Sequence, residues 1–383
     1  MMFDYLSHGK VLFGVSCAVL IFVGWLASSA YLHSRSLAAV PIRIHVAGSR
    51  GKTSTARLVA AGLRAGGLKV LAKTTGTIPL LILPDGREQK WTRWGPPTIT
   101  EQIRFFRKAA RLHVDAVVLE SMAVAPEYLW ASEKYLVRAT HVVIVNARPD
   151  HAEVLGHDPD AMAQALSLLM PRQGRVVLTK EAAVACITRQ ADKRGNSMHV
   201  VDVDGFSPDD SNTRLALEVC LQLGVDEHQA KKGMASAGTD PGAFFVYDVL
   251  NAHGQKLRFY NAFACNDTQS FQQLWLANQS RGTPVVLLNA RADRPVRTRD
   301  FLKVLAMLTP PVSLVLAGQW SASWLKGIDF GGHKVTRLKA RRAEDALIEL
   351  AALSPEPHIW GVGNYAGIGE KLIRYVKQRA AQC

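Results

Sequence analysis

The sequence predicts an α/β protein in which an N-terminal membrane helix precedes two domains, each built on a mostly parallel sheet. Three observations lead to this fold class. An uncharged segment covers residues 11–32. After it, apolar runs alternate with turn residues and with stretches of helical spacing. Finally, a glycine-containing loop at 48–53 stands between the first apolar run and the first helical stretch, an arrangement typical of nucleotide-binding α/β domains.

Composition sets the outer limits. The chain has 383 residues, 48% of them hydrophobic, which is enough for two or three domains with large cores and excludes global disorder. Its net charge of +14 favours a polyanionic partner, but the charges are dispersed, so we expect no nucleic-acid binding. An odd number of widely spaced cysteines excludes a disulfide scaffold and a zinc ribbon, and these five are Cys17, Cys186, Cys220, Cys265 and Cys383.

The uncharged segment Val11–Leu32 predicts a single transmembrane helix. As a helix it would reach roughly 33 Å, enough to cross a bilayer. Ser28-Ser29-Ala30 offers the small residues of a cleaved signal peptide, but such peptides have shorter apolar regions, so length favours an anchor. Flanking charges barely decide the orientation. If the rest of the chain uses ATP, it lies in the cytoplasm and the short N-terminus lies outside.

The soluble part is expected to contain two series of strands. Several lack polar alternation, as expected for a parallel sheet with helices on both faces. A cluster of turn formers at 238–242 predicts the hinge, so we expect an anchor at 1–35, an ATP-binding domain at 36–242 and a smaller Rossmann-like domain at 243–383. The predicted strands are Ile42–Val46, Lys69–Ala72, Ala116–Leu119, Val142–Val145, Val176–Leu178, His199–Val203, Leu257–Tyr260, Val285–Leu288, Leu314–Leu316 and His358–Trp360.

A short sequence segment, called the echo below, recurs in the two series of strands. The strands that begin at Val142 and Val285 both run into Asn-Ala-Arg-x-Asp. Chance and similar demands at a strand end explain one short echo more simply than duplication does.

The loop Gly48-Ser49-Arg50-Gly51-Lys52-Thr53, with Ser54 opening the helix that follows, is a shortened phosphate-binding loop. Glycines let the backbone N–H groups wrap around phosphate, and the helix N-terminus adds partial positive charge. Lys52 would reach the terminal phosphates and the Thr53 hydroxyl would ligate Mg²⁺. The longer form of this motif has a small residue where this chain has Val46.

Polar groups follow three neighbouring strands at the sheet edge where ligands bind. Residues 73–77 (Lys-Thr-Thr-Gly-Thr) close the second strand, Glu120 closes the third, and Asp150-His151 follow the fourth. Alone, Glu120 would be an ordinary solvated carboxylate and His151 a surface histidine. Beside a phosphate-binding loop they predict a Mg²⁺ site. His113, His141, His157 and His199 have no such context and are expected to play no chemical part.

Two further segments allow two interpretations each. Residues 91–97 carry Trp91, Arg93 and Trp94 and are either a stacking platform or a loop anchored by buried aromatics. The segment with Arg291, Asp293, Arg294, Arg297 and Arg299 is either a solvated face or a loop that binds carboxylate or phosphate.

Taken in order, the motifs resemble the ATP-dependent Mur-ligase superfamily, and more narrowly the ligase subunit of capsular poly-γ-glutamate synthase. The resemblance covers nearly the whole chain. It is carried by VAGSRGKTS, KTTGT, GPPTITEQ, VVLESMAVAPEYL, VIVNARPDHAEVLG, TDPGA, NAFACNDTQS, NARADRPVRTRDF and GVGNYAGIGEKL.

This resemblance implies an amide ligase that works through an acyl phosphate, with ATP and Mg²⁺ as cofactors. It implies that Gly48, Gly51, Lys52 and Thr53 bind triphosphate and Mg²⁺, and that Thr75 and Glu120 complete the metal site. His151 would serve a second Mg²⁺. The catalytic residues would be Lys52, Glu120 and His151. In the second domain, Asn266, Asp267, Arg291 and Arg294 would close over nucleotide or the growing chain.

The chain departs from the family pattern at several places. Many Mur ligases have a carbamylated lysine after the Asp-His motif, yet no lysine lies between His151 and Lys180. Ala125 and Glu153 stand where the capsule family tends to have asparagine and aspartate, and Trp94 and Thr98 also differ. We expect altered substrate contacts before lost ATP chemistry.

The leading hypothesis is therefore a membrane-anchored ligase that polymerises glutamate at the cytoplasmic face, with membrane subunits of a capsule synthase complex as partners. A ligase that adds an amino acid to a small acceptor is the alternative within this class. A membrane-anchored P-loop phosphotransferase or regulatory ATPase is the alternative from another class, although it predicts a tyrosine-rich tail and the tail RYVKQRAAQC contains a single tyrosine. The glutamate enantiomer, the primer and the oligomeric state do not follow from the sequence.

Overall fold

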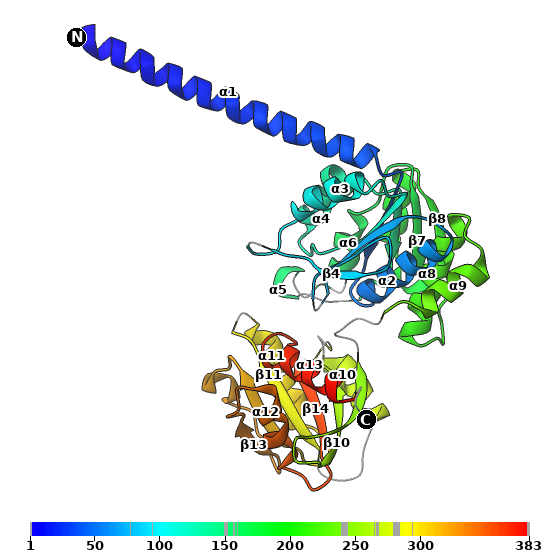
Figure 1. Cartoon of the computed structure of the whole chain (residues 1–383), viewed down its shortest axis with the longest axis vertical. Coiled ribbons are helices and arrows are strands. Elements are labelled where there is room, and N and C mark those ends of the chain that lie inside the picture. The colour runs from blue at the N-terminus through cyan, green and yellow to red at the C-terminus, as the bar shows by residue number, and fades with distance from the viewer. Residues whose placement is uncertain are drawn as a thin grey trace. The chain divides into compact units, whose positions relative to one another are not determined.

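The chain folds into two compact units, Met1–Gly238 and Thr239–Cys383 (Figure 1). The computed structural model describes residues 2–380 apart from 77, 94, 149–151, 156–157, 159, 239–243, 264, 266–267, 279–283 and 293, and at 2–11, 152–153, 208–209 and 269–270 it describes only the backbone. Residues 239–242 of the predicted hinge, TDPG, thus lie outside the described residues.

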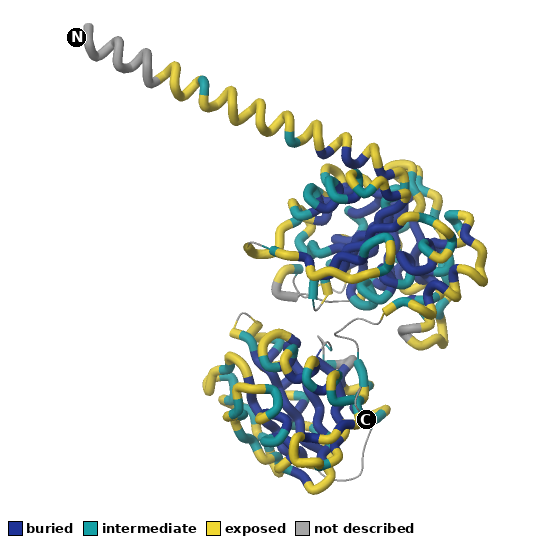
Figure 2. The backbone as a smooth tube through the Cα atoms, in the orientation of Figure 1, coloured by how far each residue is buried: buried dark blue, intermediate teal, exposed yellow. Residues whose placement is uncertain are grey.

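The first unit begins with α1 (Met2–Ala38), one uninterrupted helix of 37 residues. Its segment Leu12–Ala38 has the length and composition of a membrane-crossing helix, with a mean hydropathy of 2.0 and no residue of the most apolar window buried. Figure 2 shows the exposed course of α1 and the buried residues at its C-terminal end. The helix extends beyond the predicted Val11–Leu32 at both ends.

The sheet of the first unit has eight strands in the order β4-β3-β2-β5-β1-β6-β7-β8. Six of them run parallel, and β3 and β4 are added antiparallel at one edge. The strands are β1 (Ile42–Ala47), β2 (Val70–Thr74), β3 (Leu80–Ile82), β4 (Glu88–Lys90), β5 (Ala116–Glu120), β6 (His141–Ile144), β7 (Arg175–Thr179) and β8 (Ser197–Val201).

Helices cover both faces of this sheet, because its central strands are apolar on both sides. One face packs against α2 (Lys52–Ala65), α8 (Pro208–Gln222) and α9 (Glu227–Ala235). The other packs against α3 (Glu101–Arg111), α4 (Pro126–Ala131), the π-helix η1 (Ser132–Val137), α6 (Ala161–Ser167) and α7 (Ala185–Lys193). The short elements α5 (Ala152–Leu155) and η2 (Lys180–Ala182) lie in the connections.

The second unit repeats this architecture on a smaller scale. Its sheet has the order β13-β12-β11-β14-β10-β9, parallel except for β9. Trp360, 1% exposed, is at the centre of its core and stacks on Tyr260 with ring centroids 4.3 Å apart. The strands are β9 (Phe245–Leu250), β10 (Lys256–Asn261), β11 (Val285–Ala290), β12 (Ser313–Gly318), β13 (Lys334–Arg337) and β14 (His358–Gly363), and the helices are α10 (Thr268–Ala277), α11 (Pro295–Ala306), η3 (Ala322–Leu325), α12 (Ala343–Ala351) and α13 (Ile368–Ala380).

The predicted fold class is confirmed, and each predicted strand overlaps an observed one. The sequence analysis missed β3, β4, β9 and β13, which lie at or beside sheet edges. Edge strands have fewer neighbours and tolerate polar residues, as β4 (Glu-Gln-Lys, all exposed) shows. The strand predicted at His199–Val203 is displaced to Ser197–Val201, because its exposed edge gives little apolar signal.

The buried side chain of His141 makes the stability of the first unit depend on pH. Its side chain is 7% exposed at the start of β6, and burial, with a smaller effect of the nearby Arg175, lowers its pKa from 6.5 to about 4. In the unfolded chain it binds a proton below pH 6.5, whereas in the folded chain it does so only near pH 4. The free energy of unfolding therefore falls between these pH values, by up to about 3 kcal/mol.

We expect His141→Gln to flatten the pH dependence of stability between pH 6.5 and 4, measured by denaturant unfolding at several pH values. His228→Gln, an exposed histidine on α9, is the matched control and should keep the wild-type slope. An unchanged slope in His141→Gln would show that other groups carry the acid sensitivity.

Candidate functional site

The phosphate-binding loop connects β1 to α2 and depends on two glycines in the left-handed half of conformational space. Gly51 is the N-cap of α2, with φ 80°. Gly48 has φ 135°, and a Cβ there would lie 2.9 Å from the carbonyl oxygen of Asn146. Other residues rarely adopt these angles, so glycine is required at both positions. Since α2 begins at Lys52, the residues Lys52, Thr53 and Ser54 form its first turn, where helix N–H groups face the loop.

A buried side chain that the sequence analysis did not single out fixes the loop. The Oδ1 of Asn146, just after β6, accepts hydrogen bonds from the N–H groups of Ser49 and Arg50, both at 3.0 Å. Its Nδ2 donates to the carbonyl of Arg50 at 3.2 Å. The Ser49 hydroxyl adds a hydrogen bond to the carbonyl of Arg148. The loop is therefore held from the neighbouring strand, which leaves the first turn of α2 to meet an anion.

Lys52 lies folded back over this loop. Its Nζ donates to the carbonyl of Gly48 at 2.6 Å and to that of Ser49 at 3.1 Å. These carbonyls hold the ammonium group at the mouth of the loop. A phosphate bound there would compete with these two carbonyls for the ammonium group, and it has the advantage of being a charged acceptor whereas they are neutral.

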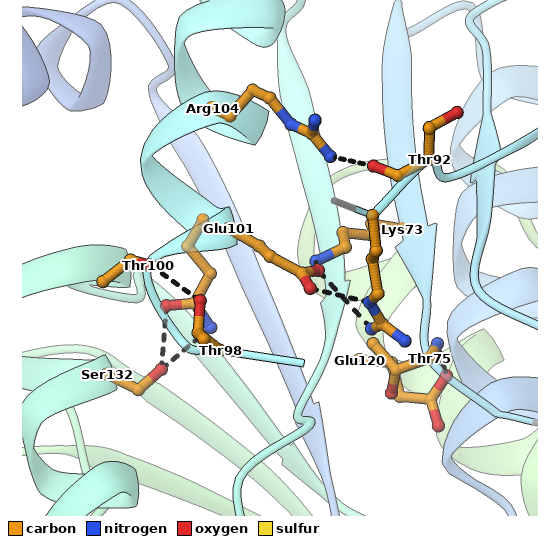
Figure 3. A network of polar contacts seen from close by, with 11 residues as sticks. Lys73, Thr75, Thr92, Thr98, Thr100, Glu101, Arg104, Glu120 and Ser132 are labelled. Carbon is orange, nitrogen blue, oxygen red and sulfur yellow. Dashed lines mark hydrogen bonds and ion pairs between the residues drawn. The ribbon is translucent and has the colours of Figure 1, made fainter. Parts of the chain in front are cut away.

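Glu120 joins the loop to the ends of two other strands. The carboxylate is 3% exposed at the end of β5. Its Oε1 accepts a hydrogen bond from the Thr53 hydroxyl at 2.9 Å, and its Oε2 accepts one from the N–H of Thr75. Figure 3 shows Glu120 beside Thr75. The structure thus brings together three of the four predicted metal-site residues, Thr53, Thr75 and Glu120.

This donor set fits Mg²⁺. Within the described ranges no group of three or more His, Cys, Asp or Glu residues could hold a metal alone. Mg²⁺ does not need such a group, because it is usually held by one or two carboxylates, with waters and phosphate oxygens completing its shell. A carboxylate and a hydroxyl at the mouth of a phosphate-binding loop supply that part.

A second polar network involves Lys73 of β2, the strand that ends just before Thr75. Lys73 on β2 is 1% exposed, and its Nζ lies 2.7 Å from Oε2 of Glu101. Arg93 bonds the other oxygen of Glu101, also at 2.7 Å. Figure 3 shows Lys73 and Glu101 meeting. The sequence analysis had no signal for this pairing, since Glu101 belongs to α3 and is far from Lys73 in the chain.

The pKa values in this network follow from burial and pairing. Burial lowers the pKa of Lys73, and the hydrogen bond from its ammonium to Glu101 offsets only part of that effect. For Glu101, burial alone would raise the pKa, but hydrogen bonds from Arg93 and Lys73 outweigh it and the pKa is lowered. The pair is therefore a structural ion pair that ties α3 to the strand leading into Thr75.

Trp91 anchors the loop that follows β4. It is 6% exposed, with the Arg104 guanidinium 4.0 Å and the Lys73 ammonium 4.8 Å from its ring centroid. Of the two interpretations of segment 91–97, buried anchoring therefore holds for Trp91. Trp94 lies outside the described residues.

Not all predicted site residues can be placed. His151, Asn266 and Asp267 lie outside the described residues. Arg291, half-buried, and Arg294, exposed at the N-cap of α11, follow β11 in the second unit. The phosphate-binding loop belongs to the first unit, so the closing role of these arginines stays a prediction.

The asparagine of the echo, Asn146 in the first unit and Asn289 in the second, has a similar structural role in both units. Asn289, at the end of β11, donates from Nδ2 to the carbonyls of Asn364 and Ala366, in the glycine-rich loop after the adjacent strand β14. Asn146 holds the loop after β1, which neighbours β6. In both units an asparagine at or just after the end of one strand fixes the loop that follows the neighbouring strand, so similar demands at a strand end explain the echo.

Two family descriptions match the chain. The Mur ligase middle domain matches residues 46–222, and the poly-gamma-glutamate synthase CapB C-terminal domain matches residues 246–379. These ranges contain the phosphate-binding loop with Glu120 and nearly all of the second unit.

Relatives and solved structures agree with these matches. PGA synthase CapB of Bacillus subtilis is 30% identical over 95% of this chain and 97% of its own length. Capsule biosynthesis protein CapB of Bacillus anthracis is 28% identical over 90% of this chain and 78% of its own. The fold resembles the bifunctional folylpolyglutamate synthase/dihydrofolate synthase of Yersinia pestis, solved with AMPPNP and Mn, with a TM-score of 0.62 and 17% identity over 91% of this chain and 92% of that one.

The role of Asn146 can be tested directly. We expect Asn146→Ala to weaken nucleotide binding by about 10- to 100-fold, because two loop N–H groups lose their buried acceptor and the loop loses its preset shape. Calorimetric titration with ATP and Mg²⁺ measures this change.

Asn196→Ala is the matched control. Asn196 likewise holds backbone, accepting from Gly174 and donating to Ala191, but at a distant turn. The control should bind nucleotide as the wild type does. Wild-type affinity in Asn146→Ala would remove this residue from the site.

Proposed function

The chain belongs to the CapB family of poly-γ-glutamate synthases in the Mur-ligase superfamily and is an ATP-dependent ligase; from this premise we propose that it polymerises glutamate into poly-γ-glutamate. The observation that carries the proposal is the preset phosphate-binding loop with Glu120 bonded to Thr53, in a chain that matches a CapB relative over nearly its whole length.

The proposed reaction proceeds through an acyl phosphate. An oxygen of the carboxylate at the end of the growing chain forms a bond to the γ-phosphorus of ATP, and the bond to ADP breaks. The amine of the incoming glutamate then attacks the acyl carbon and loses a proton. As the amide forms, the C–O bond breaks and inorganic phosphate leaves with one oxygen from the former carboxylate.

The chain's own residues hold and neutralise the anions that must meet. The N–H groups at the first turn of α2 and the ammonium of Lys52 would face the β- and γ-phosphates. Thr53 and Glu120, with Thr75 beside them, would hold Mg²⁺. When bound, this ion neutralises phosphate charge and polarises the γ-phosphate. His151 is proposed to serve a second Mg²⁺, and Asn266, Asp267, Arg291 and Arg294 to contact nucleotide or the growing chain.

The membrane location is part of the proposal. The exposed apolar helix α1 supports a single-pass anchor, and the use of ATP requires both units on the cytoplasmic side. A polymer made there must cross the membrane, so we expect membrane subunits of a capsule synthase complex as partners. The surplus of 46 Lys and Arg over 32 Asp and Glu residues suits a product with one free carboxylate per residue.

The function is tested with membranes containing the full chain, ATP, Mg²⁺ and either L- or D-glutamate, with ¹⁸O in the carboxylates of a polyglutamate acceptor. We expect glutamate-dependent phosphate release, a γ-linked product and one ¹⁸O atom in the released phosphate. Phosphate release without any need for glutamate would favour the phosphotransferase or regulatory ATPase instead. Amide formation without transfer of ¹⁸O would exclude the acyl phosphate.

We expect Lys52→Ala to lower kcat/KM by about 10³-fold or more, because it removes positive charge that would face the transferred phosphoryl group, and Glu120→Gln by about 10²-fold, because it removes the carboxylate that would hold Mg²⁺. Steady-state phosphate release measures both. The controls are Lys193→Ala and Glu227→Gln, exposed residues of α7 and α9, which should retain wild-type activity. Full activity in a folded Lys52→Ala or Glu120→Gln protein would exclude that side chain from the mechanism.

A further inference from the structure

The last turns of α1 pack against the first unit. His33, Ser36 and Leu37 are buried, whereas residues 12–32 before them are mostly exposed (Figure 2). The His33 Nε2 lies 3.1 Å from the carbonyl oxygen of Leu136 in η1, and its ring meets Phe106 of α3 edge to face. Arg107 of α3 donates to the Ser29 hydroxyl at 3.4 Å. The end of α1 is thus attached to α3 and η1.

These contacts fix the level of the bilayer relative to α3 and η1. The uncharged segment of α1 ends at Leu32, and Arg35 is the first charged residue after it. A helix rises about 1.5 Å per residue, so Ser29 lies about 5 Å inside that boundary. Arg107, which reaches Ser29, and Leu136, which meets His33, therefore lie at the depth of the lipid headgroups.

Exposed aromatic and cationic side chains gather on the helices beside this point. Tyr128 and Trp130 of α4 and Tyr135 of η1 are 55%, 38% and 47% exposed. The Lys134 ammonium lies 4.4 Å from the ring centroid of Trp130 and 4.9 Å from that of Tyr135. Together with the exposed Arg138, these five residues form what we call the α4–η1 patch. In Figure 1, α4 lies beneath the C-terminal end of α1.

The chemistry of the α4–η1 patch suits a membrane surface. Tyrosine and tryptophan favour the headgroup layer because one end of each ring system is apolar and the other polar. Lysine and arginine there attract anionic lipids, which enrich the cytoplasmic leaflet. Within 126–138 the carboxylate of Glu133 is buried, so Glu127 is the one exposed acid of that segment.

We propose that the α4–η1 patch docks on the anionic headgroup layer of the same bilayer that α1 enters, which gives the first unit a second attachment. The proposal rests on the membrane insertion put forward under Proposed function. Two attachments on one unit fix its tilt and rotation above the bilayer, whereas a single transmembrane helix, even one packed firmly against the unit, can still tilt and rotate in the membrane. The phosphate-binding loop, which follows the far end of β1 from α1, is then held at one set distance and angle from the membrane surface.

The test uses the full chain in lipid nanodiscs, with bromine on the upper part of the acyl chains as a short-range quencher. The fluorescence of Trp130 is obtained by subtracting the tryptophan fluorescence of the Trp130→Phe variant from that of the wild type. With about 30% phosphatidylglycerol we expect bromine to reduce this difference about twofold, and with phosphatidylcholine alone much less. Lys134→Glu should abolish the effect of phosphatidylglycerol.

The matched control is Arg214→Glu. Arg214 also lies over an exposed aromatic ring, that of Phe206 at 3.6 Å, but it belongs to α8 on the other side of the sheet. This variant should be quenched as the wild type is. Equal quenching in Lys134→Glu and Arg214→Glu would overturn the electrostatic part of the proposal.

Alkaline carbonate extraction shows whether α1 is a transmembrane anchor independently of whether the α4–η1 patch contacts lipid. Protein that stays in the membrane while Trp130 is not quenched would overturn the lipid-facing patch and leave the anchor intact. If Trp130 is then shielded only after membrane subunits are added, the patch is a protein interface. Extraction of the wild type by carbonate would overturn both the anchor and the patch.

Discussion

One buried amide organises the site. The side chain of Asn146 satisfies the N–H groups of Ser49 and Arg50 from the neighbouring strand, and the loop passes so close to its backbone that position 48 admits only glycine. Buried N–H groups without a partner cost about 1–3 kcal/mol each, so this bonding selects one loop conformation. The first turn of α2, the Lys52 ammonium and the Thr53 hydroxyl all take their positions from that conformation. The phosphate-binding geometry is therefore held by hydrogen bonds within the protein itself.

The second unit uses the same construction with different hydrogen-bond partners. Asn146 presents its oxygen to two N–H groups, whereas Asn289 presents its nitrogen to two carbonyls. The amide group can do either, which explains why asparagine serves at both strand ends. The common requirement is a parallel sheet in which the loop after one strand lies against the end of the next.

Charge is distributed according to the anions this enzyme must handle. At the phosphate-binding loop, the Lys52 ammonium and the first turn of α2 supply positive charge. Deeper in the sheet, Lys73 is matched by Glu101, since burying either charge alone would cost several kcal/mol. At the α4–η1 patch the cations are exposed and stand among aromatic rings. The net charge of +14 is thus the sum of several local arrangements and identifies none of them by itself.

The sequence alone determined the fold class and the phosphate-binding loop, because glycine spacing and the alternation of apolar runs are local signals that survive without coordinates. The family followed from the resemblance of its motifs, taken in order, to those of known ligases. It also predicted Glu120 beside Thr53, since parallel strands end at a common edge. Only the tertiary structure identified Asn146, the pairing of Lys73 with Glu101 and the docking of His33 on η1. These contacts join residues 28 to 103 positions apart, and such partners leave no mark on local periodicity. The stabilisation that these contacts provide depends on how deeply their residues are buried, and the tertiary fold sets that burial.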